Sequence, residues 1–173
     1  MEPIIIKNRV FRLLGCVYYG DPFHFHSKKE WTYENEIGLL WKRFGGLIRK
    51  YSILLDKINA NPEFGYEVHL EPEEYRETKQ YYVIVGIEVN NIEEIPLEMF
   101  IKILPRTDYI LVTTKVNSSN TEIQDLYDEW IPKNNYQNSY PYLIQAYEQK
   151  RYFGLENPAS EIDWYIPIKP VEK

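Results

Sequence analysis

Residues 160–169 read SEIDWYIPIK, and their apolar side chains recur at every second position. The apolar members are Ile162, Trp164, Ile166 and Ile168, and they alternate with Glu161, Asp163, Tyr165 and Pro167. A two-residue repeat is typical of a β-strand with unlike faces, so the segment predicts a strand that carries two carboxylates and a phenol on one side. Two interpretations stay open. The polar side faces solvent, as in many antiparallel sheets, or it faces a concave ligand pocket.

Length and composition limit the classes of protein to which this chain can belong. With 173 residues it is large enough to bury a core as one domain without disulfides or metal. A net charge of -6 opposes general affinity for nucleic acid, because binding to phosphate backbones depends on clustered Lys and Arg. The single cysteine, Cys16, cannot form an internal disulfide, which fits a reducing cytoplasm. We therefore expect a cytoplasmic protein with no direct nucleic-acid partner.

The N-terminus and the aromatic content add two further constraints. The opening MEPIIIKNRV holds only a short apolar run, too short for a signal peptide or a membrane span, so no membrane partner is expected. Aromatic residues make up 16% of the chain, mostly Tyr. Tyr and Trp combine a broad apolar surface with a polar tip, which suits pocket linings and interfaces as well as cores.

The hydrophobic periodicity predicts an α+β fold. Strands are predicted at residues 9–20, 66–70, 81–89, 99–104, 109–116, 140–148 and 161–169. Apolar residues at intervals of three and four predict a first helix over 37–51, with Thr32 as its N-cap, and a shorter helix that stops at Pro132. Each half then has the order strand, helix, strand, strand. This predicts one domain over 1–173 with an internal repeat, about 1–90 and 91–173, and a ligand cleft between the halves.

Several segments, in this order, resemble the GyrI-like effector-binding domains, also called AraC-type or bacterial transcription-activator effector-binding domains. The segments are ENEIGLLWKRF, FGYEVHLEPEE, YYVIVGIEV, IPLEMFIKILPRTDYILVTTK, LYDEWIP and SEIDWYIPIK, and together they cover nearly the whole chain.

The resemblance implies a duplicated β-α-β-β module that forms one antiparallel sheet, with two helices on one face and a central groove. Family members use that groove to hold small molecules, often aromatic and cationic, as the sensing parts of transcription regulators or as free-standing multidrug-binding proteins. A subset hydrolyse strained cyclopropane-bearing toxins, and another relative binds DNA gyrase. The match starts near residue 9, so we expect a free-standing member without a helix-turn-helix.

The resemblance also implies candidate ligand-binding residues on the last two strands. Asp163 and Tyr165 occupy the positions of a groove acid and tyrosine, and Glu161 adds a second acid on the same face. Relatives often place a glutamate two residues before a tyrosine on the preceding strand, where this chain has Gln145 and Tyr147. An amide cannot exchange a proton near neutral pH, so this difference disfavours the hydrolase alternative.

Further candidates come from the helices and the first half of the chain. Trp41 and Trp130 correspond to the helical tryptophans of the family and serve either the core or the groove. Tyr66, and Tyr18 or Tyr19, are further candidate liners by position.

A metal or another cofactor is not expected. His24 and His26 share one side of an extended segment, but His69 is remote and no third ligand lies at a fixed spacing.

Three functional classes follow. We favour a binding protein that captures hydrophobic aromatic compounds, cationic ones among them, through ring stacking and one carboxylate. The second class is a hydrolase in which Asp163 or Glu161 acts as general base beside a tyrosine. The third is an interaction protein that binds gyrase or a regulator. The first class makes and breaks no bond and needs only a small-molecule partner.

Overall fold

The computed structural model describes residues 2–23, 35–57, 61–90 and 94–171. Its strands are β1 (Ile4–Arg9), β2 (Arg12–Gly20), β3 (Asn61–Leu70), β4 (Tyr81–Glu88), β5 (Phe100–Ile103), β6 (Thr107–Lys115), β7 (Tyr136–Asn138), β8 (Tyr142–Glu148) and β9 (Glu161–Pro170). Its helical segments are α1 (Glu36–Lys50), α2 (Ser52–Lys57), α3 (Tyr75–Thr78), α4 (Ser119–Asp125), the π-helix η1 (Leu126–Trp130) and α5 (Ile131–Lys133).

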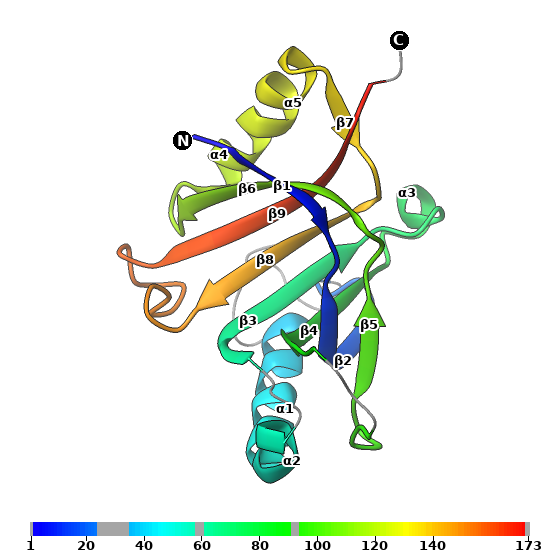
Figure 1. Ribbon diagram of the computed structural model, residues 1–173, viewed down its shortest axis with the longest axis vertical. Helices are drawn as coiled ribbons and strands as arrows, with labels where there is room; N and C mark the ends of the chain where they lie inside the picture. Colours follow the sequence, from blue (N-terminus) through cyan, green and yellow to red (C-terminus); the bar gives the residue numbers. More distant parts are fainter. Residues whose placement is uncertain (1, 24–34, 58–60, 91–93, 172–173) are drawn as a thin grey trace.

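All described strands belong to one antiparallel sheet, which confirms the predicted α+β class and the single antiparallel sheet. The order across the sheet is β1-β6-β9-β8-β3-β4-β2-β5, and β7 pairs with β9 (Figure 1). Strands β3 and β8 pair in the middle, and the strand nearest the C-terminus, β9, lies in the interior between β6 and β8. The short strand β7 was not among the strands predicted from the sequence.

The long helices cover one face of the sheet at its two ends (Figure 1). Helix α1 packs on β2 and β4 around Val85, whereas the segment from α4 to α5 packs on β6 and β9 around Trp164. Glu67 of β3 pairs directly with Val85 of β4 on one side and with Gln145 of β8 on the other. Gln145 in turn pairs with Trp164 of β9. Directly paired residues point to the same side of a sheet, so all four side chains face the helices. Glu67 and Gln145 lie midway between them.

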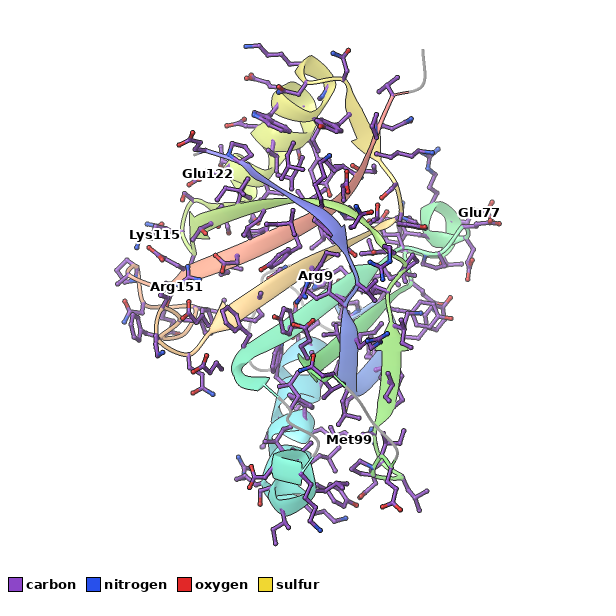
Figure 2. The ribbon with its side chains drawn as sticks, viewed as in Figure 1. Arg9, Glu77, Met99, Lys115, Glu122 and Arg151 are labelled. Atoms are coloured by element: carbon purple, nitrogen blue, oxygen red, sulfur yellow. The ribbon has the colours of Figure 1, made fainter. Side chains whose placement is uncertain are left out.

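The opposite face of the sheet is also buried in its middle. Phe11 packs edge-on against Tyr66, Tyr109 and Tyr165, with ring centroids 5.1 to 5.6 Å apart. Arg9, labelled near the middle of the sheet in Figure 2, stacks on the Phe11 ring and pairs with Glu88. The central strands therefore have apolar contacts on both sides.

The helix ends differ from the sequence expectation. Thr32 lies outside the described residues, and α1 is capped by Asn35, whose side chain accepts a hydrogen bond from the backbone N–H of Gly38 at 3.0 Å. The second helix does not stop before Pro132, because α5 includes this residue. The wider π turn of η1 and the early position of Pro132 in α5 accommodate a residue without an N–H. No helix in the described part of the chain has the length and apolar character needed to cross a bilayer.

Candidate functional site

Glu67 is a fully buried carboxylate on the middle strand β3, on the helix side of the sheet. The Trp41 indole Nε1–H donates a hydrogen bond to Oε2 at 2.5 Å, and Nε2 of His69 lies 2.6 Å from Oε1. Among the described residues, no Lys or Arg forms an ion pair with this carboxylate. Burying a carboxylate costs free energy unless it is paired, and the partners of Glu67 are the Trp41 indole and the His69 imidazole. A buried ionisable group with such partners is a candidate for a functional site.

Two aromatic residues from different elements cover this carboxylate. The indole of Trp41, on α1, lies so close to β3 that a Cβ atom on Gly65 would stand 2.9 Å from its Cη2 atom. The same ring meets Tyr147 of β8 edge-on, with centroids 5.6 Å apart. The Tyr147 hydroxyl donates to Oε1 of Gln145 at 2.5 Å. The centre of the helix-side face is therefore closed by two rings in edge-to-face contact and by paired polar groups.

A cavity of about 470 Å³ lies on the Trp41 side of Glu67, and we call it the indole-side cavity. Its lining consists of Gly38, Trp41, Phe44, Gly45, Ile48, Arg49, Gly65, Ile87, Tyr147, Gln149 and Tyr152. Most of these side chains are apolar or aromatic, and none carries a carboxylate.

A second cavity, of about 610 Å³, lies on the His69 side, and we call it the imidazole-side cavity. Its lining consists of Asp21, Phe23, His69, Glu71, Tyr75, Lys79, Tyr81, Tyr127, Asn138, Pro141, Tyr142 and Leu143. Aromatic rings and two carboxylates dominate, with one lysine. Organic cations prefer such surroundings.

The phenols in this cavity stay protonated at neutral pH. Burial raises the pKa of Tyr127 to about 12. Burial also raises the pKa of Tyr81, and the negative charge of Glu67 adds to the effect. These groups can therefore donate hydrogen bonds, but they do not supply a base near neutral pH.

The acids of β9 lie on the other side of the sheet. Ile162, Trp164 and Ile166 face the helices, so Glu161, Asp163 and Tyr165 point away from them. These three side chains therefore do not share a face with the helices that carry Trp41 and Trp130. The alternation was correct, but it does not tell which face the helices cover.

Both acids of β9 are neutralised within the protein. Asp163 accepts hydrogen bonds from Arg151, with Nη2 to Oδ2 at 2.6 Å, and from Thr113 at 2.6 Å. Glu161 pairs with Lys115 at 2.7 Å. Figure 2 shows Arg151 and Lys115 at the same end of the sheet. This arrangement ties the segment between β8 and β9 to the sheet.

Tyr165, Tyr66, Tyr18 and Trp130 line neither cavity. Tyr165 and Tyr66 pack in the core on the far face, and burial raises the pKa of both phenols. Tyr18 packs at the edge of the α1 core, and Trp130 stacks on Tyr136 with nearly parallel rings.

The structure does bring together Trp41, Gln145 and Tyr147. The sequence interpretation missed Glu67 and His69, although they alternate with Tyr66 and Val68 on a predicted strand. His24 and His26 lie outside the described residues.

Comparisons with known proteins extend this description. The model of the Cass2 family, described as integron-associated effector binding protein, matches residues 15–168. We found no curated protein with significant sequence similarity.

Three solved structures share the fold at low sequence identity. SAV2435 bound to tetraphenylphosphonium aligns with a TM-score of 0.61 and 8% identity, over 98% of this chain and 94% of its own. The Vibrio cholerae integron cassette protein VCH_CASS2 aligns with a TM-score of 0.56 and 13% identity, over 96% of this chain and 95% of its own. A hydrolase encoded by lin2189 from Listeria innocua aligns with a TM-score of 0.57 and 9% identity, over 97% of this chain and 92% of its own.

Proposed function

The chain belongs to the Cass2 family of integron-associated effector-binding proteins, and on this premise we propose that it captures hydrophobic aromatic cations at Glu67. The observation that carries the proposal is the fully buried Glu67 carboxylate, which has no Lys or Arg partner among the described residues and lies between two cavities. A cation bound there would place a permanent positive charge beside a carboxylate that otherwise pairs with His69. The fold of SAV2435, solved with tetraphenylphosphonium, is in keeping with this ligand class.

We further propose that the chain is one domain made of two β-α-β-β halves that meet at β3 and β8, with a ligand groove along this seam. The strand order β3-β4-β2 on one side of the seam matches β8-β9-β6 on the other, which supports a duplication that divides the chain near residue 90. Glu67 and Gln145 face each other across the seam. In this scheme Gln145 stands at the position equivalent to the acid.

The imidazole-side cavity is the better seat for the cation. Asp21 and Glu71 add negative charge at its walls, and the rings of Tyr81 and His69, with centroids 5.5 Å apart, offer aromatic faces. Rotation of the His69 ring away from Glu67 would let the cation approach the carboxylate.

The charge of Glu67 supplies most of the expected affinity. At a separation of about 5 Å and an effective dielectric constant of about 20, the attraction is about 3 kcal/mol. Each well-placed aromatic face adds roughly 0.5 to 2 kcal/mol.

The test compares a cation with a neutral molecule of similar shape. Isothermal titration with tetraphenylphosphonium should show binding to the wild type, and Glu67→Gln should weaken it about 100-fold, the equivalent of about 3 kcal/mol. Triphenylphosphine oxide, which is neutral, should respond little to the same substitution. Equal tetraphenylphosphonium affinity of wild type and Glu67→Gln would refute the proposal.

Hydrolysis is the second candidate function, and the Glu67–His69 pair is the observation that favours it. A buried carboxylate can orient an imidazole so that the ring takes a proton from an attacking water. The water oxygen would bond to a carbon of a strained cyclopropane, the ring C–C bond would break toward a conjugated acceptor, and the imidazolium would return the proton. Asp163 and Glu161 are less suitable bases because they pair with Arg151 and Lys115.

Chromatography of a conjugated cyclopropane substrate tests this second candidate. Turnover by the wild type that disappears in His69→Gln would support it, and background turnover by both proteins would exclude it for that substrate class.

A further inference from the structure

We propose that the indole-side cavity is a separate binding site for a small aromatic carboxylate, and that Arg49 recognises the carboxylate group. The walls suit an aromatic body. Trp41, Tyr147 and Tyr152 supply rings, and Phe44 and Ile87 of the core supply apolar surface. A volume of about 470 Å³ holds a bicyclic ring system.

Glycines keep this cavity open. Gly38 and Gly45 lie in α1 and line the cavity. Glycine is the poorest helix former after proline, so these positions disfavour the helix in which they lie. A Cβ atom on Gly45 would meet only the Arg49 guanidinium, with Nη1 at 3.8 Å. The space beside Gly45 is therefore free for a ligand.

The charge at this cavity is positive, the reverse of the imidazole-side cavity. Arg49 is exposed on the last turn of α1 and forms no hydrogen bond or ion pair with another described residue. Its Nη1 atom lies over the helix surface at Gly45, on the cavity wall. Since no lining residue carries a carboxylate, a guanidinium without a partner selects an anion, and its planar fork matches a carboxylate.

The two cavities are distinct sites because a buried contact separates them. The Trp41 indole lies on the wall of one cavity and His69 on the wall of the other, and both bond to Glu67 between them. Within the described part of the chain, no residue lines both cavities. An anion on the Arg49 side therefore does not need the Glu67 charge, so this proposal stands or falls independently of cation capture.

The experiment titrates the wild type and four variants with 2-naphthoate and with its neutral analogue 2-naphthamide, by isothermal calorimetry. Gly45→Leu fills the cavity from a position where leucine favours the helix, and Gly46→Leu is its matched control, because a Cβ atom on Gly46 meets nothing within 4 Å. Arg49→Gln removes the charge, and Arg43→Gln removes one from an exposed site of α1 that does not line the cavity.

We expect 2-naphthoate to bind the wild type about 5-fold more tightly than 2-naphthamide, the effect of one ion pair at a cavity mouth. Arg49→Gln should abolish this difference, and Gly45→Leu should abolish binding of both compounds. Gly46→Leu and Arg43→Gln should bind like the wild type.

Several results would overturn the proposal. These are no binding of 2-naphthoate, equal affinity of the two compounds, and an unchanged affinity in Arg49→Gln or Gly45→Leu. Circular dichroism checks that each variant is folded. If Gly45→Leu fails this check, Gly45→Met, with a flexible side chain, takes its place.

Discussion

The substitution Asp163→Asn distinguishes a structural role of this carboxylate from a role in ligand binding. We expect it to lower the free energy of unfolding and to leave the affinity for tetraphenylphosphonium unchanged. The side chain is only 8% exposed, and Arg151 contacts both its oxygens, at 2.6 and 3.2 Å. Removing one partner of a buried ion pair costs about 3 to 5 kcal/mol. The Arg151 side chain is 34% exposed, so water compensates part of this loss, and we expect about 2 kcal/mol.

A double-mutant cycle measured by urea unfolding checks this value. Arg151→Met should cost a similar amount, and the double variant should lose less than the sum, with a coupling of about 1 to 2 kcal/mol. Lys115→Met is the control, because its ion pair with Glu161 is more exposed and should contribute less than about 0.5 kcal/mol. The reasoning fails if the coupling is below about 0.5 kcal/mol. It also fails if Asp163→Asn keeps its stability and loses affinity for tetraphenylphosphonium.

Two more predictions concern stability. Gly15→Ala should prevent folding, because the added Cβ atom would lie 1.8 Å from the carbonyl oxygen of Val85. Gly46→Ala adds a Cβ atom that has no neighbour within 4 Å, so it should stabilise α1 by up to about 1 kcal/mol. Thermal melts measure both effects. The ion pair with Lys115 holds the pKa of Glu161 below its usual range, so the unfolded chain binds more protons and stability should fall as the pH drops from about 5 to about 3. Urea titrations over this range should give a smaller slope for Glu161→Gln, and an equal slope would contradict the assignment.

The strand over residues 161–169 shows what periodicity can and cannot predict. The alternation correctly predicted β9, because one set of side chains is apolar. It could not predict which set faces the helices, because this strand is covered on both faces: Ile162 is buried on one and Asp163 on the other. The charge of Asp163 is compensated by Arg151, and no local pattern links these two residues.

The centre of the candidate site was only partly predictable. Trp41, Gln145 and Tyr147 were identified from the family resemblance, and the structure places them together. Glu67 and His69 share a face of the predicted strand over 66–70, so the sequence contained the signal. Their importance became visible only through the pairing of Glu67 with Gln145, which depends on a register between segments far apart in the chain.

The interior position of β9 has a consequence for how the chain acquires its structure during synthesis. Among the described strand pairings, β1 and β6 connect to the rest of the sheet only through β9. A nascent chain that lacks residues 161–170 therefore leaves the edges of β6 and β8 unpaired, a condition that favours association between chains. The pairing of such distant segments slows folding. We therefore expect the nascent protein to depend on protection from aggregation until its C-terminal strand has left the ribosome.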